Sequence, residues 1–274
     1  MAERGRAWAL VQGDCMEALD KMPPHSVDVA FADPPYLLSN GGTTCQSGKR
    51  VSVNKGGWDE SRGVADDHAF HARWLGAVRR VLKPSGTLWV SGTQHVIFSI
   101  GFAMQELGFH LLNTVTWYKP NASPNLACRF FTHSTEILLW ASPVRTRPLP
   151  HRFNYPAMKA TNGGKQMRDL WDIWEAPAPG DEQVIWSLPT PAPREKLYGR
   201  HPTQKPLALL ERVLQASAAP GDLVLDPFSG SATTGVAALR AGCRFLGIER
   251  DAGYLDLGAR RLRSAEALPA SETA

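Results

Sequence analysis

Short apolar runs alternate with stretches of helical apolar spacing along most of the chain. A short apolar run is typical of a strand that is buried on both faces. Such runs predict strands over residues 8–11, 27–32, 87–90, 111–118, 137–140, 223–225 and 245–248. Helical spacing predicts helices over residues 70–82, 96–107 and 207–218, one that ends at 241 and one that starts at 251. Strands that alternate with helices indicate an α/β fold with a mostly parallel sheet.

Two stretches interrupt this alternation. Residues 37–63 are rich in Gly, Ser, Thr and Asn and show no period, so we expect a long loop of the kind that covers functional sites. Residues 142–200 are crowded with prolines and charges, and we interpret them as an insertion or a separate small lobe. The polar end of the chain should fray. The resulting division is 1–142, 143–200, 201–264 and a flexible tail over 265–274.

The tetrapeptide Asp33-Pro34-Pro35-Tyr36 follows the predicted strand over 27–32, at the end where α/β sheets bind their ligands. The exocyclic amino group of a nucleobase is a poor nucleophile, because its lone pair is delocalised into the ring. Asp33 offers a carboxylate and Pro34 a carbonyl on a restricted backbone, and both can accept N–H bonds from such an amine. Tyr36 offers a flat face to a base that has left its stack. These four residues are therefore the candidate catalytic residues.

A glycine-bearing turn over 226–235 lies between a predicted strand and a predicted helix, and small residues there allow a cofactor to approach the backbone. Glu249 ends the next strand, where a carboxylate commonly holds the ribose hydroxyls of an adenosine. An ordinary tight turn is the plainer interpretation, but the Glu249 partner favours an adenosine cofactor. The chain has neither GxxxxGK[ST] nor GxGxxG, so S-adenosylmethionine, which lacks a pyrophosphate, fits better than a dinucleotide. Asp14 is either a further adenine contact or a plain turn residue.

The amino-acid composition argues against a membrane-spanning, a secreted or a disulfide-bonded protein. The 274 residues are 43% hydrophobic, and no apolar stretch approaches the roughly 20 residues that span a bilayer. No signal-peptide core follows the N-terminus, and the four cysteines are scattered without a CxxC pair. We therefore expect a cytoplasmic protein with reduced thiols and no membrane partner. The eight histidines show no metal-ligand spacing, so we expect no metal.

The net charge of +4 does not by itself indicate a nucleic-acid partner, but the cations are unevenly distributed. Residues 144–168 contain no acidic side chain, and aromatic residues interleave with the basic ones. We interpret this stretch as a DNA-contacting segment, with a solvated basic face as the plainer alternative. The basic residues concerned are Arg145, Arg147, Arg152, Lys159, Lys165 and Arg168, with Lys49, Arg50 and Lys55 in a loop that we expect to close over DNA.

The order of three motifs resembles that of the β-group DNA amino-methyltransferases. DPPY at 33–36 comes first, HPTQKP at 201–206 comes late, and DPFSGSATTG at 226–235 comes last. In that family the catalytic motif likewise precedes the target-recognition region and the cofactor motif. The resemblance covers residues 8–262 and is poor over 143–200.

This resemblance implies a Rossmann-like, S-adenosylmethionine-dependent methyltransferase fold with a mostly parallel, seven-stranded sheet. Residues 1–142 would be its catalytic half, 143–200 its target-recognition insertion and 201–264 its cofactor-binding half. The stretch 37–58 is also similar to the second adenine methylase of Dpn-type restriction systems.

Carried over residue by residue, the resemblance assigns roles to the motif positions. Asp33 and Pro34 would accept from the adenine amino group, and Tyr36 would stack on the flipped base. Asp226 would lie beside the methionine part of the cofactor, and Glu249 would bind ribose. Further cofactor residues are Asp14 and Cys15 around adenine, His201, Thr203, Gln204 and Lys205 at the methionine end, and Phe228, Ser229, Gly230, Ser231, Ala232, Thr233 and Arg250. The family often has Gly at the position of Ala232, whose methyl group we expect to crowd the cofactor slightly.

The resemblance implies site-specific methylation of DNA at N6 of adenine, by base flipping and direct in-line attack, in a restriction–modification or phage-borne system. DPPY points to adenine, whereas a Ser in the first position is more usual for N4 of cytosine. Cytosine-N4 methylation, a catalytically silent DNA-binding protein and an RNA substrate remain open. The resemblance also leaves open whether the DNA is duplex or single-stranded, whether the protein forms a homodimer and whether a cognate restriction endonuclease exists.

Overall fold

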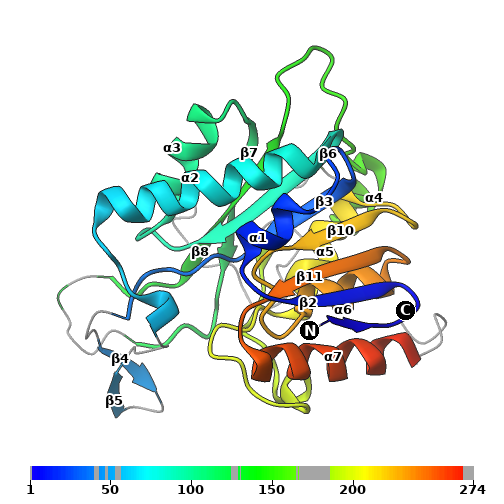
Figure 1. Cartoon of the computed structure of the whole chain (residues 1–274). Coiled ribbons are helices and arrows are strands. Elements are labelled where there is room, and N and C mark those ends of the chain that lie inside the picture. The colour runs from blue at the N-terminus through cyan, green and yellow to red at the C-terminus, as the bar shows by residue number, and fades with distance from the viewer. Residues whose placement is uncertain are drawn as a thin grey trace.

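A nine-stranded sheet forms the centre of the molecule, in the order β1-β2-β11-β10-β3-β6-β8-β7-β9 (Figure 1). The computed structural model describes residues 2–39, 43–46, 49–52, 57–124, 129, 131–164, 166 and 186–267, with the backbone alone for 43–46, 49–52 and 58. The strands of the sheet are β1 (Ala2–Arg4), β2 (Trp8–Gln12), β3 (Val27–Ala32), β6 (Leu82–Gly92), β7 (His110–Tyr118), β8 (Thr135–Ser142), β9 (Trp186–Ser187), β10 (Leu223–Asp226) and β11 (Arg244–Glu249).

The strands β2, β11, β10, β3 and β6 run parallel, so their carboxyl ends share one edge of the sheet, here named the carboxyl edge. The other edge is the amino edge. Strand β8 is antiparallel to both of its neighbours, which places its first residues at the carboxyl edge. All seven predicted strands lie in the centre of the sheet. The expected number was too small, because the short strands β1 and β9 extend the sheet on its two sides.

Helices cover both faces of the sheet (Figure 1). One face carries α1 (Cys15–Asp20), α2 (Val64–Val81) and α3 (Ile97–Glu106), and the other carries α4 (Tyr155–Thr161), α5 (Leu207–Ser217), α6 (Thr233–Arg240) and α7 (Ala252–Ala267). Successive side chains of a strand point to opposite faces. Along β3, Val29 and Phe31 therefore enter one hydrophobic core, and Ala30 and Ala32 enter the other.

The irregular stretches contain more structure than the sequence predicts. The expected loop over 37–63 contains a hairpin of β4 (Thr43–Gln46) and β5 (Lys49–Ser52), followed by the 3-10 turn η1 (Gly57–Asp59). The expected turn over 83–86 is part of β6, and α7 continues three residues past the expected start of the tail.

Parts of the segment 143–200 pack on the main sheet layers. Helix α4 lies against α5, where the Asn154 side chain donates to the carbonyls of Gln215 and Ala218. Strand β9 pairs with β7, and a 3-10 turn η2 (Pro193–Lys196) follows it. The described parts of this segment thus rest against the same body as the strands. None of the helices in the described part of the chain is both long and apolar enough to cross a membrane.

Candidate active site

A cavity of about 630 Å³ opens at the carboxyl edge. Its wall is built by the turns that follow β2, β3, β10 and β11, which supply Asp14, Asp33, Phe228 and Glu249. Further predicted residues in the wall are Cys15, Pro35, His201, Thr203, Gly230 and Arg250. The structure therefore brings together residues from both ends of the chain, as a ligand site at this edge requires.

The turn after β10 is held by a buried carboxylate. Asp226 accepts from the backbone N–H of Phe228 at 3.0 Å and from the hydroxyl of Thr234 at 2.6 Å. Burial raises the pKa of Asp226 to about 7, against the effect of these two hydrogen bonds. Asp226 is absent from the described cavity wall, although we expected it beside the methionine part of the cofactor. Its carboxylate stabilises the turn instead.

Gly230 and Ala232 in this turn both have left-handed backbone conformations. At Gly230, with φ of 50°, a Cβ atom would lie 3.1 Å from Nε2 of His201, so the position favours glycine. Ala232, with φ of 56°, directs its methyl group toward Gly258 of α7. The expectation that this methyl group crowds the cofactor is therefore wrong, because Ala232 lies behind the cavity wall.

Glu249 lies at the end of β11 and faces the cavity. One carboxylate oxygen accepts from the N–H of Gly230 at 2.7 Å, and the other accepts from the N–H of Asp251 at 2.8 Å. Burial raises the pKa of Glu249, partly offset by these backbone bonds. The carboxylate is thus fixed in direction, and each oxygen keeps a lone pair for a further donor.

Asp14 and Cys15 form the part of the wall that follows β2. Asp14 caps helix α1 by accepting from the N–H of Met16 at 2.8 Å. Burial, together with the charge of Asp14, raises the pKa of the Cys15 thiol to about 12. Cys15 is therefore a neutral thiol that packs in the wall.

Five predicted cofactor residues lie behind the wall, outside the described lining: Gln204, Ser229, Ser231, Thr233 and Ala232. Arg261 of α7 binds two of the three hydroxyl residues among them. Its guanidinium donates to the side chains of Ser231 at 2.9 Å and Thr233 at 2.8 Å, and to the Ser231 carbonyl. Gln204 donates to the carbonyl of Glu195 at 2.9 Å. These residues hold the cofactor turn in place.

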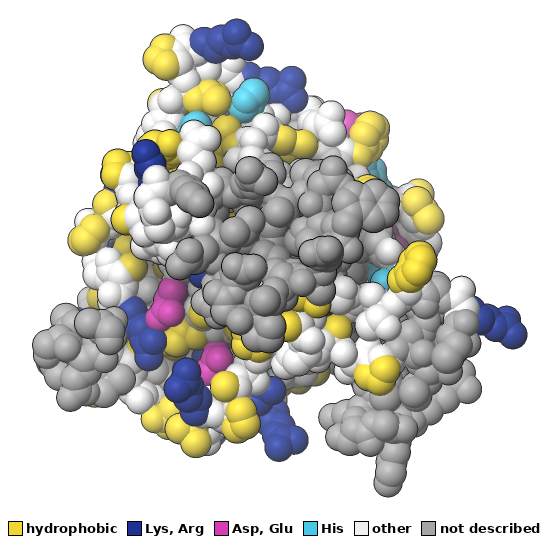
Figure 2. All heavy atoms as spheres, turned by 180° about the vertical axis from the view of Figure 1, so that it is seen from behind, with side chains coloured by type: hydrophobic (Ala, Val, Ile, Leu, Met, Phe, Trp, Pro, Cys, Tyr) yellow, Lys and Arg dark blue, Asp and Glu magenta, His cyan; other side chains and the backbone are white. Residues whose placement is uncertain are grey.

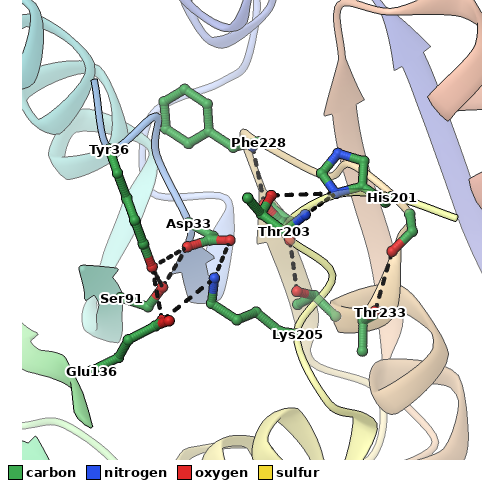
Figure 3. Close-up of polar contacts among 12 residues, drawn as sticks. Asp33, Tyr36, Ser91, Glu136, His201, Thr203, Lys205, Phe228 and Thr233 are labelled. Atoms are coloured by element: carbon green, nitrogen blue, oxygen red, sulfur yellow. Dashed lines mark hydrogen bonds and ion pairs between the residues drawn. The ribbon is translucent and has the colours of Figure 1, made fainter. Parts of the chain in front are cut away.

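A cluster of buried and half-buried polar side chains, which we name the carboxylate cluster, lies beside the cavity. It consists of Asp33, Tyr36, Ser91, Glu136 and Lys205, which Figure 3 labels, together with Lys119. Asp33 accepts from Tyr36 at 2.9 Å and from Ser91 at 2.5 Å through one oxygen. Its other oxygen accepts from Lys205 at 2.6 Å. Lys205 therefore contacts the catalytic tetrapeptide directly, and its expected position at the methionine end of the cofactor stays a prediction.

Glu136 is the second carboxylate of the cluster. It accepts from Lys119 at 3.1 Å, lies 3.6 Å from Nζ of Lys205, and competes with Asp33 for the one proton of the Tyr36 hydroxyl, which lies 2.9 Å from it. Burial alone would raise the pKa of Glu136, but the charges of Lys205 and Lys119 outweigh it and lower the pKa. Burial likewise opposes the charge on Lys205, whereas Asp33 and Glu136 raise its pKa. Both side chains are therefore charged.

Tyr36 is part of this cluster rather than an open platform. The residue is 7% exposed, and Nζ of Lys205 lies 5.1 Å from the centre of its ring. Burial and the two neighbouring carboxylates raise the pKa of its hydroxyl well above the ordinary value. The ring thus lacks the open face that stacking on a base requires, and the expected stacking role does not fit the described geometry.

The predicted DNA-contacting cations whose side chains the structure describes do not line the cavity. Arg145 donates to the carbonyl of Phe109, and Arg152 pairs with Asp222 at 3.0 Å. Both lie at the amino edge, because they follow the end of β8, and Asp222 precedes β10. Exposed Arg147 and Lys159 belong to the same region. The side chains of Lys49, Arg50, Lys55, Lys165 and Arg168 lie outside the described residues.

On the face shown in Figure 2, Lys and Arg side chains lie in several places around the residues drawn in grey. The cations that do border the cavity are Arg62 and Arg250. Among the residues that the structure describes, no group of His, Cys, Asp and Glu side chains is arranged to hold a metal ion.

An α/β sheet with this cavity and carboxylate cluster at its carboxyl edge defines a Rossmann-like methyltransferase. A family model described as DNA methylase matches residues 27–260. The chain therefore belongs to the DNA methylase family.

Two curated relatives carry names from restriction systems. The type II methyltransferase M2.DpnII of Streptococcus pneumoniae is 47% identical over 255 residues, covering 93% of this chain and 89% of the relative. The type II methyltransferase M2.MboI of Moraxella bovis is 43% identical over 252 residues, covering 92% and 86%. The similarity to a Dpn-type methylase, expected from the motifs, is confirmed.

Solved structures share the fold. The M1.HpyAVI–SAM complex is similar with a TM-score of 0.62 at 23% identity, covering 92% of this chain and 98% of that one. The PvuII cytosine-N4-specific DNA methyltransferase has a TM-score of 0.68 at 19% identity, covering 93% and 86%. The fold is therefore shared with a protein whose printed specificity is cytosine N4.

Proposed function

We propose that this DNA methyltransferase transfers the methyl group of S-adenosylmethionine to N6 of adenine within a specific DNA sequence. The observation that carries the proposal is the position of Asp33. Its carboxylate lies in the wall of the cavity and at the same time in the buried carboxylate cluster. An amine that reaches Asp33 from the DNA side is therefore beside a cavity of cofactor size.

The cavity wall fits S-adenosylmethionine chemically. We assign Glu249, whose carboxylate is held by two backbone N–H groups, to the ribose hydroxyls, and Asp14 in the same wall to the adenine. Acidic side chains suit a ligand that carries an ammonium and a sulfonium. Phe228 packs edge-on against Trp74 at 5.4 Å between ring centres, which gives that side of the wall a rigid apolar surface. When bound, the cofactor supplies an electrophilic methyl group.

The protein side of the reaction is positioning. Asp33 accepts one N–H of the adenine amino group, and the carbonyl of Pro34 accepts the other. These hydrogen bonds reduce the delocalisation of the nitrogen lone pair into the ring, so that the lone pair is available for attack. Asp33 also stabilises the positive charge that develops on the nitrogen during attack. Such catalysis needs no covalent intermediate, since holding the reacting atoms in line supplies most of the rate enhancement.

DNA is proposed to lie across the carboxyl edge. A second cavity of about 520 Å³ opens there beside the carboxylate cluster, lined by Gln94, His95 and residues 131–135. Phe131 projects from this wall with 96% of its surface exposed. An exposed aromatic ring next to the site suits stacking on a base or filling the space that a flipped base leaves.

The choice of base rests on the catalytic tetrapeptide. The fold does not decide it, because a cytosine-N4-specific enzyme shares that fold. Asp at position 33 favours adenine, and cytosine N4 is the second candidate. A cognate restriction endonuclease belongs to the same proposal, supported by the type II names of the relatives. A cytoplasmic site of action and a homodimer are further parts of the proposal.

Methyl transfer from tritium-labelled S-adenosylmethionine to unmethylated genomic DNA, followed by nucleoside analysis, tests the proposal. We expect label in N6-methyladenine, and sequencing of the modified sites then identifies the target. Label in N4-methylcytosine would overturn the choice of base. Absence of label on duplex and single-stranded DNA, with the cofactor bound normally, would overturn the proposed reaction.

A further inference from the structure

The Asp33 carboxylate is almost saturated with donors from the protein. A carboxylate has about four acceptor lone pairs, two on each oxygen. The hydroxyls of Ser91 and Tyr36 lie 2.5 and 2.9 Å from Oδ1, and Nζ of Lys205 lies 2.6 Å from Oδ2. When the Tyr36 proton is directed at Asp33, these contacts leave one acceptor position, on Oδ2. Because Asp33 lines the cavity, that position is available to an incoming amine.

We propose that Glu136 and Lys205 are positioning residues that hold Asp33 with this single acceptor position directed at the amino group of the target base. The inference rests on the proposed function, because it needs an amine as the attacking group. Neither residue touches the substrate in this arrangement. Both act through Asp33 (Figure 3).

The Tyr36 hydroxyl connects the two carboxylates. It lies 2.9 Å from Oδ1 of Asp33 and 2.9 Å from Oε2 of Glu136, but it has one proton to donate. Ser91 already donates to Asp33 Oδ1 at the shorter distance. Glu136 therefore competes for the Tyr36 proton and determines how strongly Tyr36 holds Asp33.

Glu136 also determines where the Lys205 ammonium lies. Lys205 is 7% exposed by its side chain and lies between two acids, 2.6 Å from Asp33 and 3.6 Å from Glu136. Glu136 is kept in place from its other side by Lys119 at 3.1 Å. Two acids and two lysines thus give a buried group without net charge. A buried charge that loses its partner is unfavourable, so removal of Glu136 draws Lys205 fully onto Asp33.

A purely structural role for this network makes a different prediction. A network that only stabilises the fold changes the unfolding midpoint and leaves the rate of methyl transfer per folded molecule intact. A positioning role lowers that rate while cofactor affinity and base flipping persist. Misplacement by about 1 Å can lower a rate about a hundredfold.

The test compares Glu136→Gln with the matched control Asp28→Asn in the full chain. Asp28 also accepts from a lysine, Lys83, at 2.6 Å, but at the amino edge, away from the cavity. Single-turnover transfer is measured at saturating cofactor and DNA, with the target duplex from the labelling experiment. Cofactor affinity is measured by calorimetry, and flipping by the fluorescence of 2-aminopurine at the target position.

For Glu136→Gln we expect a transfer rate roughly a hundredfold lower, with cofactor affinity and flipping signal within about threefold of the original chain. Asp28→Asn should keep the original rate. A Glu136→Gln rate within about threefold of the original would overturn the positioning role, as would equal rate losses in both variants. Failure of the original chain to methylate DNA would instead overturn the proposed function, so the two failures are distinct.

Tyr36→Phe is the second variant: it is measured alone if Glu136→Gln does not fold, and also in the double variant if Glu136→Gln folds. It keeps the ring and removes only the hydroxyl that joins Asp33 and Glu136. We expect a roughly tenfold slower transfer, and a loss in the double variant smaller than the product of the two single losses, because both act on Asp33. An unchanged rate in Tyr36→Phe, or independent losses in the double variant, would overturn the coupling.

Discussion

The two edges of the sheet carry ion pairs with the same bond length and different surroundings. Lys83 donates to Asp28 at the amino edge, and Lys205 donates to Asp33 at the carboxyl edge, each at 2.6 Å. The Lys83 side chain is 38% exposed, whereas that of Lys205 is 7% exposed. Solvent screens the first pair, so it is worth little beyond joining strands. The second is shielded from solvent and borders a cavity.

The remaining partners of the two aspartates sharpen this contrast. Asp28 uses its other oxygen to accept from the backbone N–H of Leu223 at 2.9 Å, which ties β3 to β10. Asp33 uses its other oxygen for two hydroxyls and keeps an acceptor position toward the cavity. Bond length does not separate a structural ion pair from a functional one. The two kinds of ion pair are distinguished by the burial of their side chains and by whether a cavity lies beside them.

The largest effect should come from removing each aspartate in turn. Asp33→Ala should lower the rate of methyl transfer at least roughly a thousandfold, since it removes the group that stabilises developing charge. Cofactor affinity should change only a few-fold. Asp28→Ala should keep the rate and lower the free energy of unfolding by about 1 kcal/mol. Label transfer and denaturant titration measure the two quantities, and substantial turnover by Asp33→Ala would contradict the role of Asp33.

Asp226 at the carboxyl edge should make the free energy of unfolding depend on pH. Burial raises its pKa from the ordinary 3.8 to about 7, so the folded chain holds a proton that the unfolded chain has already released. The free energy of unfolding should therefore fall as pH rises from about 4 to about 7, by roughly 4 kcal/mol at most. Asp226→Asn should flatten this decline. Denaturant titrations at several pH values check it, and an equal slope in both proteins would argue against a protonated Asp226.

A smaller effect should separate Glu249 at the carboxyl edge from Glu211, an exposed ion-pair partner of Arg240. Glu249→Ala should raise the dissociation constant of S-adenosylmethionine roughly 10- to 100-fold, because it removes a charged acceptor of ribose hydroxyls. Glu211→Ala should bind normally. Calorimetric titration gives both constants, and unchanged affinity in Glu249→Ala would remove the ribose assignment.

The smallest effect concerns the side on which DNA binds. Phe131→Ala should raise the KM for DNA roughly tenfold through lost stacking. Arg152→Gln should leave that KM within about twofold and the salt dependence unchanged, since Arg152 pairs with Asp222 at the amino edge. Steady-state kinetics at two salt concentrations measure both. A larger loss in Arg152→Gln than in Phe131→Ala would place DNA on the opposite edge.

The sequence predicts the strands, the tetrapeptide and the cofactor turn, because each is a local pattern. It does not predict that Glu136 belongs to the site, although that residue directly precedes a predicted strand. A polar residue at the start of a strand reaches the carboxyl edge only if the strand is antiparallel to its neighbours, as β8 is. Strand direction depends on pairings between distant segments and is not visible in the spacing of apolar residues.

The basic segment over residues 144–168 is a second example in which the position of a residue in the fold cannot be predicted from local sequence. Its composition predicts a surface for DNA, but composition does not say at which edge of the sheet the segment emerges. Because β8 returns the chain to the amino edge, Arg145 and Arg152 find partners in Phe109 and Asp222. Lys205 illustrates the same limit. Its sequence motif predicts a contact with the cofactor, whereas in the fold its side chain donates to Asp33.

The strand order also has a consequence for synthesis of the chain. Strands β10 and β11 come last in the sequence, yet they lie between β2 and β3, which come first. A nascent chain therefore holds β2 and β3 with unpaired inner edges until residues 223–249 have left the ribosome. Such open edges slow folding and favour aggregation. Methyl transfer consequently requires residues 223–249, and a chain that stops before them should be inactive rather than partly active.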